Sequence, residues 1–385
     1  MDGVLTDDQI AIRDSVQSYL TRTAGLEALR AVLESKDGWD RNCWTGLSRD
    51  LGICAIMIPE EFGGLGLGAT AMALVLEETG SRLVSAPVFE CGVMAATTIL
   101  ATGSDSQKHA LLPGLADGSL TIIPAVVGAT GVAGTTGLTA SLTGDQDGSF
   151  RLNGDSGFVT FAASADLFLI AARQSDGSVS LVALPADSDG LTIEALNGLD
   201  PTRPFARLRF DDVAVAADRL LGGSACVADA LDRSLAISVG LLAAEQTGGA
   251  AFCLSSTVEY AAQRVQFGRT IGSFQAVKHE LADMVSRIEA GRSAALTSAA
   301  MIDAWLSGQA GEDELLAATS GAAAWCAETY RFCAGQAIQL HGGIGFTWEH
   351  QAHLYFKRAW FTSQWLGDPA SHRERVARAI GLDAA

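Results

Sequence analysis

The sequence predicts an α+β fold in which a central β-sheet segment is flanked by two helical segments. Three observations lead to this prediction. Apolar residues recur three and four apart over residues 1–115, short strand-like runs fill residues 116–222, and long alanine-rich stretches occupy residues 223–385. Of the 385 residues, 48% are hydrophobic and 18% are charged, so the chain can bury large cores and is not disordered. We therefore expect three domains with these boundaries.

The first segment is expected to form an N-terminal helical domain. Thr6, followed by two acidic residues, is typical of a helix start, because its side-chain oxygen can accept backbone N–H groups and acids suit the positive end of the helix dipole. The glycine-rich run Pro59–Gly68 interrupts the helical pattern. This run superficially resembles a dinucleotide-binding loop, but it follows no clear strand–helix unit. A tight turn between helices is therefore the favoured interpretation.

The second segment is expected to form a central antiparallel β-barrel or sandwich. Runs rich in Val, Ile, Thr and Phe are separated by turn dipeptides such as Asp147-Gly148 and Asp176-Gly177, with no helical stretch between them. These strand-like runs include residues 120–123, 150–152, 157–161, 167–170 and 180–184. The third segment returns to helices over residues 228–259, 275–306 and 313–339. We expect the two helical segments to pack together into one bundle, with the sheet as an inserted layer.

The charge balance excludes some classes of partner. Lys and Arg number 26 and Asp and Glu 44, which gives a net charge of −18. So acidic a surface repels nucleic acid and anionic membranes, although a local basic cluster can still bind an anionic ligand. No apolar run reaches the roughly 20 residues that a membrane span requires, and the acidic N-terminus lacks the pattern of a signal peptide. We therefore expect no nucleic-acid or membrane partner.

The cysteines and histidines indicate neither disulfides nor a metal site. The seven cysteines are scattered and form no CxxC pair, which is typical of reduced, mostly buried thiols in a cytoplasmic protein. His350 and His353 are three residues apart, but no third ligand is evident nearby. The expected localisation is cytoplasmic, and no metal is expected.

Two motifs in the third segment carry the chemistry of a site for a phosphate-containing ligand. The first runs from Arg264 through Phe267, Arg269 and Phe274 to Gln275, and the second covers residues 339–346. The two guanidinium groups can bind phosphate in a bidentate manner. Glycines without a Cβ let backbone N–H groups approach a ligand closely, and glutamine amides suit an adenine or ribose edge.

Together with the Pro59–Gly68 turn and the helix–sheet–helix order, these motifs resemble the acyl-CoA dehydrogenase family over nearly the whole chain. The resemblance implies a C-terminal four-helix bundle and a tetramer that binds FAD between its subunits. It also implies α,β-dehydrogenation of an acyl-CoA thioester: a carboxylate removes the α-proton, hydride passes to the flavin, and electrons pass on to an electron-transfer flavoprotein.

The resemblance further assigns roles to particular residues. Thr160 is expected to contact the flavin ring from the central domain. The ADP half of FAD is expected to be held by residues from both motifs: Arg264, Phe267, Phe274, Gln275, Gln339, Gly342 and Gly343.

The catalytic carboxylate departs from the family pattern. The position that usually carries the Glu is Leu366, before Gly367, and the position used by a smaller group of members is Ser238. Leucine cannot accept a proton, and an unassisted serine is far too weak a base. Two nearby acids remain as candidates for the catalytic base.

Glu245 is the first candidate and Asp368 the second. Glu245 lies two helical turns after Ser238, so the two share a face whose other residues are small or apolar, and desolvation there would raise the pKa of a carboxyl group. In the alternative interpretation, Glu245 pairs with a basic residue of another helix or faces a polar cavity between subunits. Asp368 lies two residues past the family position, and its alternative role is to cap the turn before Pro369.

The central domain also departs from the pattern. The stretch expected to contact the flavin ring reads Ile123 to Gly134, in which Gly and Ala replace the usual polar contacts. A chain with only the ADP-holding half of the site fits an α2β2 heterotetramer, in which a homologous sister subunit supplies the ring contacts. The resemblance is to such bacterial assemblies for bulky acyl-CoAs, including steroid side-chain thioesters.

Three functional interpretations remain open. The chain is a catalytic FAD-dependent acyl-CoA dehydrogenase, as one subunit type of a heterotetramer or as a homotetramer. Alternatively, it is a non-catalytic partner that completes the FAD site of a sister chain. The third interpretation is other flavin chemistry, such as oxygen-dependent oxidation. A catalytic subunit is the first expectation, because Glu245 is a candidate acid in apolar surroundings.

Overall fold

The computed structural model describes residues 5–128, 133–145, 148–222 and 227–382. It divides the chain into two compact units, each assembled from separate stretches. One unit comprises Met1–Ala31, Ala69–Val84 and Val239–Ala385, and the other comprises Val32–Gly68 and Ser85–Ser238. We call them the helical unit and the sheet unit. The predicted domain boundaries near residues 115 and 222 stay a prediction.

The N-terminal segment is helical, as predicted. Thr6 caps the first helix: its side chain accepts from the backbone N–H of Gln9, and the Gln9 side chain accepts from the backbone N–H of Thr6. The helices of this segment are α1 (Asp7–Thr23), α2 (Leu26–Glu34), α3 (Arg41–Thr45), α4 (Gly68–Ser81), α5 (Ala96–Thr102) and α6 (Asp105–Ala116).

The glycine-rich run at Pro59–Gly68 is a turn and not a dinucleotide-binding loop. No strand precedes it among the residues that the structure describes, and the run itself contains a short 3-10 turn at Glu60–Phe62. Gly64 is required by space, because a Cβ there would lie 1.9 Å from the carbonyl oxygen of Ile58. The predicted turn is therefore confirmed.

The central segment forms a mixed sheet with the order β6-β7-β3-β2-β4-β5-β8, and β1 pairs with β4. Most neighbours are antiparallel, and the predicted hairpin at Asp176-Gly177 joins β4 to β5. However, β1 and β2 both pair with β4 in parallel, so the sheet is not wholly antiparallel as expected. The strands are β1 (Ile122–Ala125), β2 (Ser141–Gly144), β3 (Phe150–Thr160), β4 (Leu167–Gln174), β5 (Val179–Pro185), β6 (Leu191–Leu196), β7 (Phe205–Val215) and β8 (Leu220–Leu221).

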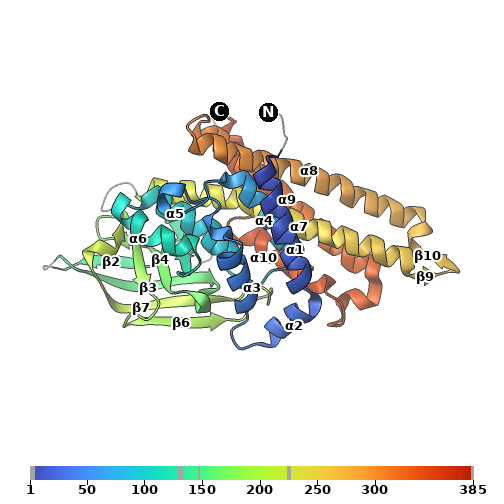
Figure 1. Ribbon diagram of the computed structural model, residues 1–385, viewed down its shortest axis with the longest axis horizontal. Coiled ribbons are helices and arrows are strands. Elements are labelled where there is room, and N and C mark those ends of the chain that lie inside the picture. Colours follow the sequence, from blue (N-terminus) through green and yellow to red (C-terminus); the bar gives the residue numbers. More distant parts are fainter. Residues whose placement is uncertain (1–4, 129–132, 146–147, 223–226, 383–385) are drawn as a thin grey trace. The chain divides into compact units, whose positions relative to one another are not determined.

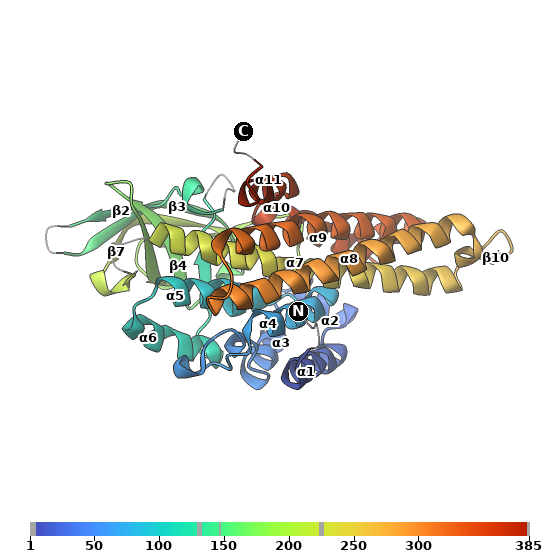
Figure 2. The same ribbon diagram turned by 90° about the horizontal axis from the view of Figure 1, so that it is seen from above.

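Long helices dominate the C-terminal segment, and α8 and α9 run side by side in opposite directions (Figure 1). Gly249 of α7 lies against α9 so closely that a Cβ would come within 2.3 Å of the Tyr330 ring. The shorter helices α10 and α11 also pack on α9 (Figure 2). The elements are α7 (Val227–Gln263), β9 (Val265–Gln266), β10 (Arg269–Thr270), α8 (Gln275–Leu306), α9 (Glu312–His341), α10 (Ala352–Trp365) and α11 (Pro369–Ala379).

Two chemical features of the described residues bear on the sequence expectations. Six cysteines are buried free thiols, as expected, and Cys226 lies outside the described residues. Within the described ranges, no helix is both long enough and apolar enough to cross a membrane, and no group of three metal-ligating side chains comes together.

Candidate functional site

The first motif forms an exposed hairpin at the end of α7. The backbone N–H of Arg264 donates to the carbonyl of Tyr260 at 2.8 Å, which ends the helix, and β9 and β10 follow. Phe267, at the tip, is 92% exposed and has a φ of +54°. The guanidinium of Arg269 lies 4.0 Å from the centre of the Phe274 ring, and the Phe267 and Phe274 rings meet edge to face at 6.2 Å.

The cations of this hairpin are available to a ligand. Arg264 and Arg269 are exposed, and neither forms an ion pair with any residue that the structure describes. Gln275 is also exposed, at the first position of α8. Exposed guanidinium groups can bind the phosphates of an adenosine diphosphate group, and aromatic rings and an amide can contact its base.

The second motif ends α9 in an exposed glycine loop. Gly342 has a φ of +64° and donates its N–H to the carbonyl of Gln339, so its backbone favours glycine. Gly343 lies outside the left-handed region, and a Cβ there would meet nothing within 4 Å. Among the residues that the structure describes, neither backbone conformation nor packing requires glycine at Gly343, which is what we expect where a ligand approaches the backbone. Gln339, Gly342 and Gly343 are all exposed.

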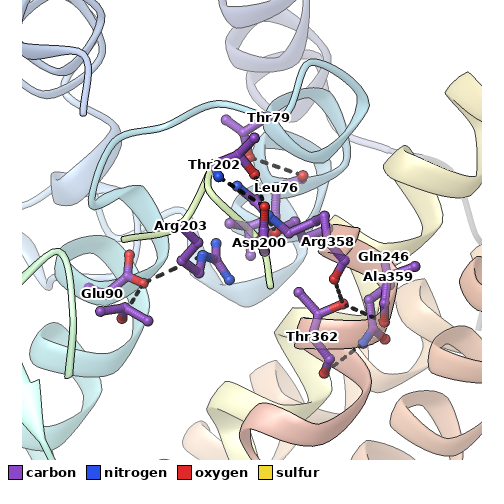
Figure 3. A network of polar contacts seen from close by, with 12 residues as sticks. Leu76, Thr79, Glu90, Asp200, Thr202, Arg203, Gln246, Arg358, Ala359 and Thr362 are labelled. Carbon is purple, nitrogen blue, oxygen red and sulfur yellow. Dashed lines mark hydrogen bonds and ion pairs between the residues drawn. The ribbon is translucent and has the colours of Figure 1, made fainter. Parts of the chain in front are cut away.

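Thr160, expected to contact the flavin ring, is directed inward in the sheet unit. Its side chain is 2% exposed, and its hydroxyl donates to Glu90 Oε1 at 2.7 Å. Arg203 Nε lies 3.8 Å from the same oxygen (Figure 3). Both charged side chains are almost fully buried. The hydroxyl hydrogen of Thr160 is therefore donated to a residue of the sheet unit itself. Residues 129–132 of the altered stretch lie outside the described residues.

Sequence reasoning missed Glu90 and Arg203. A signal existed at Glu90, the one charged residue in the apolar run from Val84 to Val93. A charge in such a run requires a buried partner, because an unpaired buried charge is very costly.

Glu245 is brought together with a basic residue of another helix. Its carboxylate accepts from Arg358 Nη1 of α10 at 2.9 Å, and the side chains of Glu245 and Arg358 are nearly fully buried, at 5% and 2% exposure. The surrounding helices meet tightly, since a Cβ on Gly80 would lie 2.1 Å from the Glu245 carbonyl oxygen. Protonating Glu245 would leave the buried Arg358 guanidinium without this counter-charge. The geometry favours the ion-pair interpretation over a free general base.

Asp368 caps the last helix. It is the N-cap of α11, and its Oδ1 accepts the backbone N–H of Ser371 at 2.7 Å. This backbone hydrogen bond lowers the pKa of the Asp368 carboxyl, because it stabilises the charged form. A lowered pKa makes the carboxylate a weaker base, so the geometry favours the capping interpretation here too.

Replacing Asp368 separates the two roles. Asp368→Asn keeps a capping oxygen and loses only the charge, so we expect turnover and most of the stability to be retained, whereas Asp368→Ala should cost about 0.5–2 kcal/mol of unfolding free energy. The carboxylate's added stabilisation is present above the unfolded pKa and is lost as pH falls through the lowered folded pKa. Urea unfolding against pH measures both effects. Loss of turnover in Asp368→Asn would contradict the capping role.

The two family positions for the base carry no acid and are buried. Leu366 is 3% exposed, and the Ser238 hydroxyl donates to the carbonyl of Ser234 at 2.9 Å. Leu366 lines a small cavity in the helical unit, where Gln246 Nε2 donates to the carbonyl of Thr362 at 3.2 Å (Figure 3). Among the described residues, the cavity is lined by Val239, Leu242, Gln246, Ala323, Ala327, Thr362, Leu366, Gly367 and His372, with no Asp or Glu.

His372 does not replace the missing carboxylate. Burial lowers its pKa to about 4, so the ring is neutral near pH 7 but is a weak base. Within the described residues, the cavity beside the family's Glu position thus lacks an effective general base.

Comparisons with known proteins show similarity to acyl-CoA dehydrogenases over most of the chain. The family description "Acyl-CoA dehydrogenase, N-terminal domain" matches residues 6–119, and "Acyl-CoA dehydrogenase, C-terminal domain" matches residues 229–381. The acyl-CoA dehydrogenase IpdE2 of Mycobacterium tuberculosis is 34% identical over 375 residues, which covers 97% of this chain and 98% of that protein.

Two solved structures are similar over their full length. A variant of the steroid ACAD Tcur3481-Tcur3483 is 31% identical with a TM-score of 0.85, and the match covers 98% of this chain and 99% of that one. The ChsE4-ChsE5 complex from Mycobacterium tuberculosis is 27% identical with a TM-score of 0.88, and the match covers 100% of both chains. The predicted fold class is therefore confirmed.

Proposed function

We propose, from the premise that this chain belongs to the acyl-CoA dehydrogenase family, that it is the FAD-completing subunit of a heterotetrameric dehydrogenase for bulky acyl-CoA thioesters. Members of the family are oxidoreductases that act on acyl-CoA. The observation that carries the proposal is the buried ion pair between Glu245 and Arg358. This ion pair occupies the carboxylate of the first candidate base. The two motifs proposed to hold the ADP group are mostly exposed.

The chain's own residues would act by binding and orientation. Arg264 and Arg269 would neutralise the pyrophosphate, and Phe267 and Phe274 would provide apolar faces for the adenine. Gln275 and Gln339 would bind polar edges of the nucleotide, and Gly342 and Gly343 would let the backbone approach it. Bound FAD supplies the acceptor for the hydride that leaves the β-carbon of the acyl group.

A homologous sister subunit would supply the flavin-ring contacts and the base. In this chain, the Thr160 hydroxyl donates to a buried carboxylate, and Leu366 occupies the family's Glu position. The similar steroid ACAD and ChsE4-ChsE5 complex support a bulky acyl group and an assembly of two chain types. We propose an electron-transfer flavoprotein as the electron acceptor, as the family resemblance implies. We propose the cytoplasm as the location, because the cysteines are scattered and form no CxxC pair.

The second candidate function is that of a catalytic subunit, as one subunit type of a heterotetramer or in a homotetramer, with Glu245 as the base. The observation in its favour is that Glu245 is buried on a helix face that also carries Ser238, one of the family's base positions. The Arg358 ion pair would have to open before this carboxylate could accept a proton.

Native mass spectrometry with visible absorbance tests the proposed function. We expect the chain expressed alone to carry little FAD. Co-expression with a homologous family chain from the same genome should give a yellow α2β2 assembly with two FAD molecules per four chains. A homotetramer of this chain with one FAD per subunit would overturn the proposal.

A further inference from the structure

The two ADP-binding motifs are joined by a contact between aromatic rings. Tyr260 lies near the end of α7 and accepts the backbone N–H of Arg264 on its carbonyl at 2.8 Å. His341 is the last residue of α9 and directly precedes Gly342. The rings of Tyr260 and His341 stack with their centres 4.5 Å apart and their planes 28° from parallel. One ring contact therefore links the segment that carries Arg264 to the segment that carries Gly342.

His341 is held in a fixed orientation. Its side chain is 3% exposed, and its Nδ1 lies 2.7 Å from the carbonyl oxygen of Ala337. Since a carbonyl only accepts, Nδ1 carries the hydrogen and donates it. The glycine loop folds back on this residue, because a Cβ on Gly345 would lie 3.2 Å from His341 Cβ.

A third ring completes the arrangement. His350 lies with its ring centre 4.3 Å from that of His341, and its Nδ1 accepts the backbone N–H of Ala352, the first residue of α10. Burial lowers the pKa of both histidines, that of His350 to about 4, so the two adjacent rings are neutral near pH 7 and do not repel each other. The contact thus links the ends of α7 and α9 to the start of α10.

We propose that Tyr260 and His341 are positioning residues that hold the Arg264 hairpin and the Gly342 loop at the separation one ADP group requires. This inference rests on the proposed function and deepens it. The hairpin tip is exposed, and no described residue lies within 4 Å of a Cβ built at Gly342 or Gly343, so packing around these ligand-facing points does not fix them. A ligand that contacts both binds more tightly when their relative position is already set.

The test compares the FAD dissociation constants of co-expressed assemblies. Tyr260→Leu removes the stacking ring, and we expect a rise of about 2- to 12-fold. Tyr260→Phe keeps the ring and should leave the dissociation constant unchanged. His341→Leu should raise it at least as much as Tyr260→Leu, because it removes the ring contacts and the hydrogen bond to Ala337.

Two further measurements separate positioning from a structural role. If Tyr260 acts through Arg264, the effects of Tyr260→Leu and Arg264→Ala on FAD affinity will not add in the double variant. In the FAD-free chain, hydrogen exchange should rise in both residues 264–271 and residues 342–347 in Tyr260→Leu and in neither in Tyr260→Phe.

The outcomes also distinguish this inference from the proposed function. If Arg264→Ala does not weaken FAD binding, the proposed function fails. If Arg264→Ala weakens binding while Tyr260→Leu does not, only the positioning role is overturned. Additive effects in the double variant, or increased exchange in just one of the two segments, would overturn it as well.

Discussion

Replacing Glu245 by leucine is expected to lower the free energy of unfolding by about 3–5 kcal/mol, because it removes one partner of a buried ion pair and leaves the charge of Arg358 in place. Replacing Arg358 by methionine in the same chain removes the second charge, so the double variant should recover much of the loss. Urea unfolding of the single and double variants measures this coupling. The matched control is Glu374→Leu, which breaks the exposed ion pair with Arg378 and should cost at most about 0.5 kcal/mol.

The same double variant tests catalysis directly, because it has no carboxylate at position 245. If Glu245 and Arg358 serve the fold, turnover per folded assembly should match that of the unmodified chain. A general base typically contributes about 10²- to 10⁴-fold to the rate, so a loss of that size would identify Glu245 as the base. Glu245→Gln, which nearly preserves shape, is the second variant for this measurement. Equal unfolding free energies in the Glu245→Leu and Glu374→Leu variants would contradict the structural role.

Helical spacing predicts which face a residue occupies but not what meets that face. The seven-residue spacing from Ser238 to Glu245 correctly indicates that both lie on one small, apolar and buried helix surface. The guanidinium that meets it comes from α10, 113 residues along the chain, and no local pattern encodes that contact. The sequence alone therefore indicates a desolvated Glu245 carboxylate but does not identify an ion-pair partner. The structure shows that Arg358 is its partner.

In the sheet unit, too, local turns could be predicted from the sequence, whereas contacts between distant segments could not. The dipeptide Asp176-Gly177 fixes a hairpin locally, so its place between β4 and β5 could be predicted. The parallel pairing of β1 with β4 brings together strands separated by two others, and no turn signal marks it. Thr160 could be matched by motif, but its bond to Glu90 spans 70 residues. In contrast, the Arg264 and Gly342 motifs could be recognised from the sequence, because the residues of each motif are contiguous in the chain.

Removing the Arg264 side chain charge is expected to weaken FAD binding by about 10- to 150-fold, which corresponds to about 1.5–3 kcal/mol for a hydrogen bond to a charged group. Folding should be unaffected, because Arg264 is exposed and has no ion pair with a described residue. Fluorescence titration of the co-expressed assembly with FAD measures the dissociation constants of Arg264→Ala and of Arg264→Lys. Lysine keeps the charge but not the planar pair of donors. The FAD affinity of Arg264→Lys should therefore lie between those of the unmodified chain and Arg264→Ala.

Two companion variants make this result specific to the site. Arg373→Ala removes an exposed arginine that pairs with Glu328 in the same unit, and it should leave FAD affinity unchanged. Gly343→Ala adds a methyl group that would have no described residue within 4 Å, so the unfolding free energy should be retained while FAD affinity falls. If Arg264→Ala and Arg373→Ala weaken FAD binding equally, the loss of affinity comes from the changed net charge of the chain and not from a specific contact of Arg264. The acidic chain would then have to hold the flavin elsewhere, because its exposed hairpin and glycine loop would make no specific contact with it.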